Sequence, residues 1–336
     1  MFNSNVKIQN ANQQRKEKVN TGFPRRVFRW LKFLLLFPLA LLIMIGMLFI
    51  SGKFLTTLIE TESDPHSLAP WGSGTSFLTT RSGETHVLDV GEGDVILLVH
   101  GSSGSIADWQ ESVVDRLAQT HRVVAFDSFG FGLSERNDAF EYGPALWVEQ
   151  AVEVLDALEI ERAVIVGHSA GGAVAVGLAA YFPERVRGAV LTGHGFTADP
   201  AQMIPILPGI GEYWAARQTV IGDTYSDSYR ERAEAVHRIR GTRAAYLAFV
   251  RNQLKFLATA EGRHLAETIY ESVEVPVLQL HGTRDQSQDI ESARALSSRL
   301  PDTRFVPIEG SDHHIHFEAP EQWVEEVTSF TDSLQS

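Results

Sequence analysis

The sequence predicts an α/β fold, with a mostly parallel central sheet and helices on both of its faces. Short runs at residues 95–99, 123–126 and 163–166 are continuously apolar, and helical patterns at 107–119 and 145–158 alternate with them. Continuous apolar runs of this length are typical of strands that are buried on both faces, as in parallel sheets. Strands that alternate with amphipathic helices complete the pattern of the α/β class.

Further segments have the composition of strands in the same sheet. They are residues 77–80, 86–90, 186–191, 275–280 and 303–308. Helices are expected directly after residue 169 and from about residue 318, where Glu318-Ala319-Pro320 begins the last helical stretch. The chain therefore supplies eight strands to one sheet.

Between residues 196 and 272 the alternation stops, and the chain has helical character over a stretch that is too long for an ordinary connection. Aromatic side chains are dispersed through it, namely Tyr213, Trp214, Tyr225, Tyr229, Tyr246, Phe249 and Phe256. One interpretation is a helical hairpin that only decorates the fold. We favour a helical cap inserted after the sixth strand, because ligands bind at the carboxyl ends of such strands, where this segment leaves the sheet. The α/β core then comprises residues 76–195 and 273–336.

The amino-terminal part differs in composition from the rest of the chain. Residues 1–53 carry nine lysines and arginines against one glutamate, whereas the remainder carries 20 against 41 acidic residues. Residues 33–50 are uncharged, and as a helix they would cover about 27 Å, close to the ~30 Å hydrocarbon thickness of a membrane. We therefore predict a basic cytoplasmic tail at 1–32, a transmembrane anchor at 33–55 and a linker at 56–75.

The charges that flank the apolar run predict its orientation. Basic residues lie before it, at 25–32, and acidic residues lie after it, at 60–64. By the positive-inside rule, the amino terminus stays in the cytoplasm and the globular part is periplasmic or extracellular, in a single-pass membrane protein. The alternatives are a cleaved signal peptide, whose apolar core is normally shorter and ends at a small-residue cleavage site, and a buried core helix.

Composition excludes several classes of function. Hydrophobic residues make up 44% of the 336 residues, which is enough to build a substantial core. The chain has no cysteine, so disulfides, thiolate metal sites and cysteine nucleophiles are excluded. The acidic globular part would repel a phosphate backbone, which argues against nucleic acid as a partner. Nothing in the sequence indicates an oligomeric state.

The pentapeptide Gly167-His168-Ser169-Ala170-Gly171 lies between an apolar strand and a helical stretch of small residues. Small flanking residues let the backbone turn sharply enough to hold Ser169 in a strained conformation with its hydroxyl directed off the sheet. A Gly-x-Ser-x-Gly string alone is a weak signal, but the strand and helix on its two sides strengthen it. We predict that Ser169 is a nucleophile.

A nucleophilic serine needs a base, a group that orients the base, and donors for the oxyanion. Asp285 ends the segment His281-Gly282-Thr283-Arg284-Asp285, which follows the seventh strand. His313 ends Gly310-Ser311-Asp312-His313, which follows the last strand. The chain order serine, aspartate, histidine is the one expected when these groups share the carboxyl edge of such a sheet.

With these pieces the chain, from about residue 77 to 330, resembles the α/β-hydrolase fold family, and in particular its capped serine hydrolases. Besides the Ser169 elbow, the Asp285 loop and the histidine loop, the resemblance rests on residues 100–104, His-Gly-Ser-Ser-Gly, and on residues 127–134, which begin with Asp127. The set is similar to esterases and to meta-cleavage product hydrolases. It also resembles epoxide hydrolases and dehalogenases, but a serine in place of their aspartate nucleophile argues against those reactions.

The resemblance implies roles for individual residues. The backbone N–H groups of Ser102 and Ala170 would form the oxyanion hole. Among three nearby histidines, the spacing of five residues before Glu318 selects His313 as the base. Supporting roles beside the site fall to His100, Gly101, His168 and Asp127, and the reaction requires no metal or organic cofactor.

The histidine loop departs from the commoner family pattern, because Asp312 stands where glycine is usual and His314 and His316 follow His313. We interpret His314 and His316 as ordinary loop or helix-start residues. A metal site made of these histidines and Asp312 is an alternative, although their spacing lacks a known zinc pattern. Asp199 is an alternative acid to Asp285.

We predict a serine hydrolase that cleaves a carboxylic ester, or a related acyl compound, through Ser169, His313 and Asp285. Its partner would be a small, apolar acyl substrate, with the membrane as a second partner through the amino-terminal helix. Within the same fold, the alternatives are hydrolysis of a carbon–carbon bond of the meta-cleavage type and cofactor-free perhydrolase or haloperoxidase chemistry. From another class, the alternative is a catalytically dead, membrane-tethered binding module.

Overall fold

The computed structural model describes residues 25–61, 63–68, 72–195, 210–211 and 225–334. Most of the predicted tail, parts of the predicted linker and residues 196–209 and 212–224 of the predicted cap lie outside the described residues, and so do Asp199, Tyr213 and Trp214. The chain divides into two compact units, Met1–Leu48 and Phe49–Ser336. The α/β architecture lies in the second unit.

Helix α2, Arg25–Ile59, contains the apolar run of the amino-terminal region. Its segment Leu36–Ile59 is long and apolar enough to cross a membrane, by length and composition alone. Pro38 lies inside the helix; membrane helices tolerate proline more readily than soluble ones. The candidate span thus begins three residues after the predicted start, at 33, and continues four residues beyond the predicted end, at 55.

Eight strands form one sheet, as the sequence predicts. They are β1 Thr75–Thr79, β2 Glu84–Val90, β3 Val95–Val99, β4 Arg122–Phe126, β5 Ala163–His168, β6 Val186–Thr192, β7 Val277–Gly282 and β8 Thr303–Ile308. Their order in the sheet is β1-β2-β4-β3-β5-β6-β7-β8. β1 pairs antiparallel with β2 and β2 antiparallel with β4, and every later pairing is parallel. The six parallel strands therefore bring their carboxyl ends to one edge.

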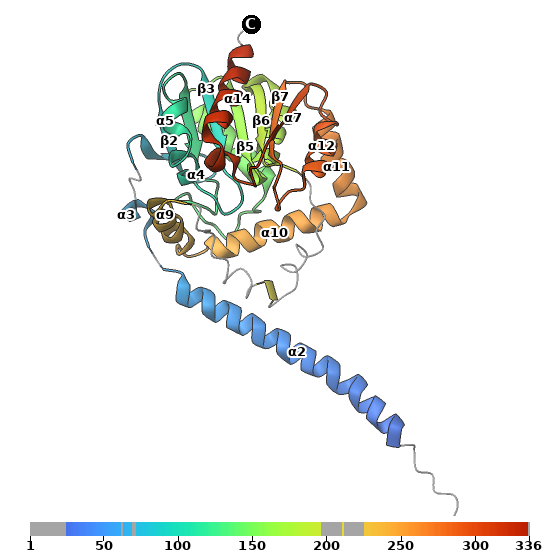
Figure 1. Ribbon diagram of the computed structural model, residues 1–336. Helices are drawn as coiled ribbons and strands as arrows, with labels where there is room; N and C mark the ends of the chain where they lie inside the picture. The colour runs from blue at the N-terminus through green and yellow to red at the C-terminus, as the bar shows by residue number, and fades with distance from the viewer. Residues whose placement is uncertain (1–24, 62, 69–71, 196–209, 212–224, 335–336) are drawn as a thin grey trace, which may run out of the picture. The chain divides into compact units, whose positions relative to one another are not determined.

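The described helices that follow α2, together with the single described 3₁₀ turn, cover the two faces of the sheet or lie around its edges (Figure 1). Beyond α2 they are α3 Pro65–Leu68, α4 Ala107–Gln110, α5 Val114–Leu117, α6 Pro144–Ala157, α7 Ala170–Tyr181, η1 Pro183–Arg185, α9 Asp227–His237, α10 Thr242–Ala258, α11 Ala260–Glu271, α12 Ile290–Ser297, α13 Ile315–Glu318 and α14 Pro320–Ser333.

Strand β3 shows why the apolar runs are continuous. Leu97 and Val99 belong to the core cluster that α6 and α7 cover, whereas Ile96 and Leu98 belong to the cluster on the opposite face, which α5 and α14 cover. Successive side chains of a strand point to opposite faces, so a strand covered on both sides must be apolar at every position. The predicted mostly parallel sheet with helices on both faces is confirmed.

The helix predicted at 107–119 is wrong as a single element, because the structure has two short helices, α4 and α5, with a break between them. Ser112 lies in the break, and its hydroxyl donates to Asp108 O at 2.6 Å. A serine side chain that bonds to nearby backbone competes with the helical hydrogen bonds. The apolar periodicity continued across this break, so the sequence pattern did not reveal it.

Strand β7 and the last helical stretch also differ from the prediction at their boundaries. Strand β7 begins at Val277 rather than at residue 275, with Pro276, which has no N–H for the ladder, immediately before it. The last helical stretch is divided into α13 and α14, and α14 begins with Pro320 at its first turn, a position where the missing N–H costs nothing.

Helices α9, α10 and α11 follow β6 in the chain, and we call them the helical insertion (Asp227–Glu271). The chain that leaves α2 is hydrogen-bonded to the corner between α9 and α10. Thr61 N donates to Arg238 O at 2.5 Å, and Arg240 N donates to Thr61 O at 3.0 Å. The Glu60 carboxylate accepts from the backbone N–H of Gly241, at the start of α10.

Candidate active site

Ser169 is the single residue between β5 and α7, at the sharp corner that the sequence predicts. Its backbone has φ 52° and ψ −115°, in a region that residues with a side chain rarely adopt. Glycines make the corner sterically possible: a Cβ on Gly167 would lie 2.1 Å from Gly171 O, and one on Gly171 would lie 2.3 Å from Val99 O. The start of α7 therefore packs directly against the ends of β3 and β5.

Asp285 and His313 are brought together from two loops at the same edge of the sheet. Asp285 follows β7, His313 lies between β8 and α13, and His313 Nδ1 is 2.8 Å from Asp285 Oδ2. Asp285 Oδ1 accepts from the backbone N–H groups of Ser287 and Gln288, at 2.8 Å each. Both carboxylate oxygens of Asp285 are thus hydrogen-bonded, and Oδ2 faces the imidazole of His313.

The electrostatics of this pair keep Asp285 ionised. Burial alone would raise the pKa of Asp285, whose side chain is 0% exposed, but the hydrogen bond and charge of His313 outweigh it and hold the pKa below its usual value. Because the carboxylate can only accept, Nδ1 carries the proton of the neutral His313 ring. Nε2, the other ring nitrogen, is left with its lone pair, and the His313 side chain remains 13% exposed.

The His313 loop lies against the residue that precedes Ser169. His168 Nε2 donates to His313 O at 3.1 Å, and the two rings are 4.8 Å apart. Among the described residues, no hydrogen bond joins Ser169 Oγ to His313. Such contacts are often long before a substrate binds.

The loop that follows β3 runs beside Ser169 on its other side. A Cβ on Gly101 would lie 3.2 Å from Ser169 Cβ. This contact would be tight, so glycine suits the position. Within the part of the chain that the structure describes, the N–H groups of Ser102 and Ala170 donate no hydrogen bond. Ala170 also begins α7, where the helix dipole favours negative charge.

His100 and Asp127 hold the loops around this edge. His100 Nδ1 donates to Gly101 O at 2.7 Å, and its Nε2 accepts from the backbone N–H of Ser128 at 2.9 Å. Asp127 accepts from the backbone N–H groups of Ile106 and Leu133, both at 2.7 Å, and from the ring of His86. His100 and Asp127 therefore connect the loops that follow β3 and β4.

Four histidines pack together next to the candidate site. The rings of His168, His313, His314 and His316 have centroids within 6 Å of at least one other ring of the group. Burial lowers the pKa of His314 to about 4, and it lowers the pKa values of His168 and His316 well below the usual range. Among the described residues, no group of three or more histidines or acidic residues has the arrangement of a metal site.

Sequence reasoning missed two buried polar pairs at this edge. His194 donates from Nδ1 to Ser169 O at 2.7 Å, and its Nε2 faces the hydroxyl of Tyr270 in α11. Asp108 accepts from the hydroxyl of Tyr229 in α9 at 2.9 Å, and burial raises its pKa to about 6. Each pair joins residues more than 70 positions apart, and no local pattern signals such a contact.

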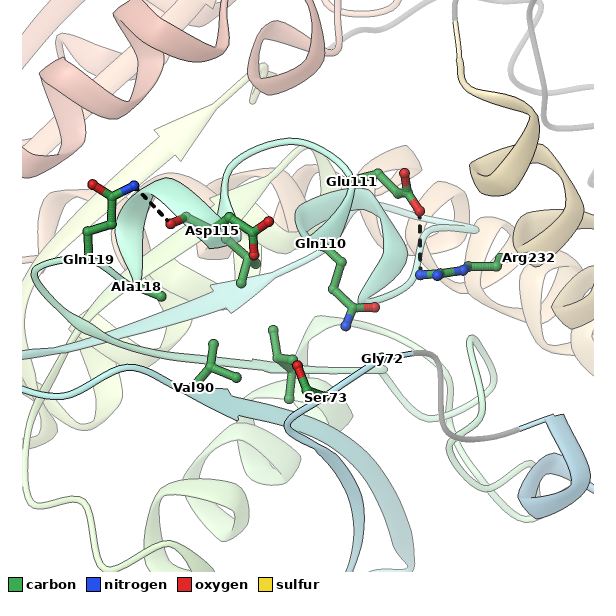
Figure 2. A pocket seen from close by; sticks show the side chains of 11 residues that line it. Gly72, Ser73, Val90, Gln110, Glu111, Asp115, Ala118, Gln119 and Arg232 are labelled. Atoms are coloured by element: carbon green, nitrogen blue, oxygen red, sulfur yellow. Dashed lines mark hydrogen bonds and ion pairs between the residues drawn. The ribbon is translucent and has the colours of Figure 1, made fainter.

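A separate hollow in the surface lies between α4, α5, β2 and α9 (Figure 2). Glu111 and Arg232 form an ion pair on its wall at 3.4 Å. The residues that line it include none of the predicted site residues. The hollow is therefore distinct from the candidate site at Ser169.

Comparisons with known proteins identify the family and the fold of this chain. A family model described as alpha/beta hydrolase fold matches residues 94–320. A 2-hydroxymuconate semialdehyde hydrolase of Pseudomonas putida is 31% identical over 272 residues, which cover 75% of this chain and 93% of that protein. A protein of the same name from Pseudomonas sp. is 42% identical over 132 residues, which cover 39% of this chain and only 45% of that protein.

A solved structure supports the fold. The meta-cleavage product hydrolase of Pseudomonas fluorescens, in a mutant complexed with acetates, superposes with a TM-score of 0.62 over 77% of this chain and 97% of that one, at 22% sequence identity. At this identity the likeness concerns the fold alone. The matched family model, the relative aligned over most of its length and the eight-stranded sheet lead to one conclusion: the chain belongs to the alpha/beta hydrolase fold family.

Proposed function

We propose that this hydrolase acts through Ser169 as nucleophile, His313 as general base and Asp285 as the group that orients His313. The observation that carries the proposal is the 2.8 Å contact between His313 Nδ1 and the buried Asp285, beside a serine held at a strained strand-to-helix corner. Fixing the Nδ1 proton on Asp285 leaves Nε2 to receive the proton of Ser169 Oγ as the hydroxyl attacks a carbonyl carbon.

The attack forms a bond between Ser169 Oγ and the carbonyl carbon, and the carbonyl electron pair moves to the oxygen. The N–H groups of Ser102 and Ala170 would hold this oxyanion. The protonated His313 then gives its proton to the leaving group as the second bond breaks. A water molecule, deprotonated by the same histidine, releases the acyl group and returns Ser169 to its free form.

For the bond that breaks, we propose a carbon–carbon bond to the carbonyl group as the leading candidate. This rests on the names of the relatives, above all the 2-hydroxymuconate semialdehyde hydrolase that aligns over 93% of its length. In such a reaction the leaving carbon keeps the bonding electrons, so it must be conjugated to another acceptor such as a second carbonyl group. The proton it receives comes from His313.

A carboxylic ester is the second candidate, with an alkoxide as leaving group. Two observations favour an apolar acyl substrate. Neutral histidine and aromatic rings gather near the site, with Tyr225 centred 5.7 Å from His314 and 4.9 Å from Phe317. The chain also has a candidate membrane span at Leu36–Ile59, which would place the enzyme near lipophilic compounds.

A two-step experiment on the full-length protein tests the proposal. An alkyl fluorophosphonate should label the folded wild-type chain at Ser169 and should not label Ser169→Ala. Turnover of a vinylogous diketone acid is then compared with turnover of acyl esters of increasing chain length, and the better substrate class decides between the two bonds. A folded wild-type protein that resists labelling would show that the chain is a binding module on an inactive scaffold.

We also propose that residues 196–272 form a cap over Ser169. Contacts of Tyr225, just before the helical insertion, and of Tyr229 within it support this, because Tyr225 packs on the histidine loop and Tyr229 donates to Asp108. For the membrane, we propose that Leu36–Ile59 is an uncleaved anchor with its amino terminus in the cytoplasm, supported by the basic residues before it and the acidic residues after it. Protease added to spheroplasts should digest the hydrolase unit; protection of that unit would contradict this orientation.

A further inference from the structure

The C=O of Ser169 and the N–H of Ala170 belong to one peptide group. A peptide group is planar and trans, so its oxygen and its hydrogen point in opposite directions. Whatever fixes the direction of the Ser169 oxygen also fixes the direction of the Ala170 N–H. That N–H is one of the two donors that the proposed function assigns to the oxyanion.

Two groups hold the Ser169 oxygen. Gly172 N donates to it at 3.0 Å from the first turn of α7, and His194 Nδ1 donates to it at 2.7 Å from the loop that follows β6. A carbonyl oxygen can only accept, so Nδ1 of His194 must carry a hydrogen. In the neutral ring, Nε2 is then an acceptor, and the hydroxyl of Tyr270 faces it as the donor.

The His194 ring is held firmly in this orientation. The residue is 5% exposed, its ring is nearly parallel to the Tyr270 ring at an interplanar angle of 4°, and its own backbone oxygen accepts from Gln279 Nε2 at 2.9 Å. A Cβ on Gly172 would lie 2.4 Å from the ring, so α7 comes into direct contact with it. Burial lowers the pKa of His194 to about 4, and the ring is neutral at pH 7.

The strain at Ser169 explains why such a clamp is useful. The combination of φ 52° and ψ −115° at Ser169 is unfavourable for a residue with a side chain. Rotation of the peptide between Ser169 and Ala170 would relieve part of that strain and turn the Ala170 N–H away from the oxyanion. The same rotation would break the bond to His194 and leave a buried Nδ1–H without its acceptor.

We propose that His194, oriented by Tyr270, is a positioning residue for the oxyanion hole, because it holds the Ser169 peptide so that the Ala170 N–H points at the developing oxyanion. The inference rests on the proposed function, since it takes Ser169 as the nucleophile. It adds a link between chemistry and the helical insertion, because Tyr270 lies in α11, 76 positions after His194 in the chain. The effect should be specific to the transition state, since His194 acts through the Ser169 peptide on a donor that is directed at the developing oxyanion.

Three variants of the full-length protein separate positioning from general structure. His194→Phe keeps the ring and removes the donor, and it should lower kcat about 10²-fold, with KM changed less than twofold. His194→Asn places an amide N–H near the position of Nδ1 and should recover activity to within about tenfold of wild type. Tyr270→Phe removes the hydroxyl that faces Nε2 and should lower kcat about threefold to tenfold.

A transition-state analogue gives the decisive readout. A trifluoromethyl ketone forms a hemiketal oxyanion with a reactive serine, so its inhibition constant should weaken in proportion to the loss of kcat/KM across the variants. The pH profile of kcat/KM should keep its midpoint, because His194 stays neutral. His121→Phe and His121→Asn are matched controls, since His121 is a buried histidine that precedes β4, at the opposite edge of the sheet, and both should resemble wild type.

The outcomes decide the proposal clearly. Folded His194→Phe with kcat/KM within threefold of wild type overturns it, as does a loss of kcat without weaker binding of the ketone. If His194→Phe does not fold, the same comparison on Tyr270→Phe and His194→Asn decides. If the ketone does not inhibit folded wild-type protein and the fluorophosphonate does not label it, the proposed function itself has failed. That result differs from one in which wild type is inhibited normally and the His194 variants are inhibited equally well, which overturns only the role of His194.

Discussion

The hydroxyl of Tyr229 donates a hydrogen bond of 2.9 Å to the buried carboxyl of Asp108. Tyr229 belongs to α9 of the helical insertion, and Asp108 belongs to α4, just after the loop that carries Ser102. A Cβ on Gly104 of that loop would lie 2.2 Å from Asp108 Oδ2, so the carboxyl is wedged against the loop backbone. One buried hydrogen bond thus fixes the helical insertion to the proposed oxyanion loop.

Removing the hydroxyl from this pair should destabilise the hydrolase unit. In Tyr229→Phe, Asp108 Oδ1 loses its partner while the carboxyl remains buried, and an unsatisfied buried group costs about 1–3 kcal/mol. Thermal unfolding in detergent measures the effect. Tyr225→Phe is the matched control from the same side of the insertion, because its hydroxyl makes no hydrogen bond among the described residues, and a loss as large as that of Tyr229→Phe would refute the assignment.

Asp108 should make stability depend on pH in an unusual direction. Burial raises the pKa of Asp108 from 3.8 to about 6. Because the folded-state pKa is the higher one, its contribution is fully present below about pH 4 and is lost as the pH rises through about 6; two pKa units correspond to on the order of 3 kcal/mol. Asp108→Asn should therefore be more stable than wild type at pH 8, with no advantage at pH 4.

Unfolding midpoints of wild type and Asp108→Asn between pH 4 and pH 8 test this expectation. Asp115→Asn, which changes an exposed aspartate of the neighbouring helix α5, should follow the wild-type curve. Parallel curves for wild type and Asp108→Asn would show that the carboxyl of Asp108 does not titrate in this range.

The two aspartates near His313 should differ sharply in importance. Asp285→Asn keeps the shape of the side chain but favours the wrong tautomer of His313, and in serine triads such a change lowers kcat about 10⁴-fold. Among the described residues, Asp312 Oδ1 accepts from the backbone N–H groups of Gln286 and His313, and an asparagine oxygen can do the same. Asp312→Asn should retain activity to within about fivefold, and steady-state kinetics that rank the two variants in the opposite order would reassign the acid.

The close approach at the serine corner predicts a steric effect on stability. In Gly171→Ala the new methyl group would lie 2.3 Å from Val99 O, against rigid strand backbone. Overpacking of this kind costs about 1–3 kcal/mol or more, and the shift of α7 should also lower the rate of fluorophosphonate labelling. Gly143→Ala, where the nearest atom to the new Cβ is 3.9 Å away, should change neither the melting temperature nor the labelling rate.

Local signals in the sequence were sufficient for the fold and for the placement of Ser169, Asp285 and His313 at one sheet edge. Each of these residues follows an apolar strand, and parallel strands must end together. Local sequence patterns do not predict contacts between polar residues that are far apart in the chain. His194 and Tyr270 are separated by 76 positions, and neither stands in a recognisable motif.

The incorrect helix at 107–119 has a related cause. The periodicity of its apolar residues is real, because Trp109, Val113 and Leu117 all pack into the same core cluster. Just after α4, the hydroxyl of Ser112 bonds to Asp108 O in the preceding turn and competes with the helical hydrogen bonds. Periodicity reports which side chains face the core, but it does not report whether the backbone between them stays helical.

The hydrogen bonds between Thr61 and the corner of α9 and α10 also determine how the molecule carries mechanical load. The chain that leaves α2 is fastened to Arg238 and Arg240 before it reaches the first strand of the sheet. A pull transmitted along α2 would reach this corner of the helical insertion before it reaches β1. Because the Tyr229–Asp108 hydrogen bond joins the insertion to the loop that carries Ser102, tension at the amino-terminal end would be passed toward that loop.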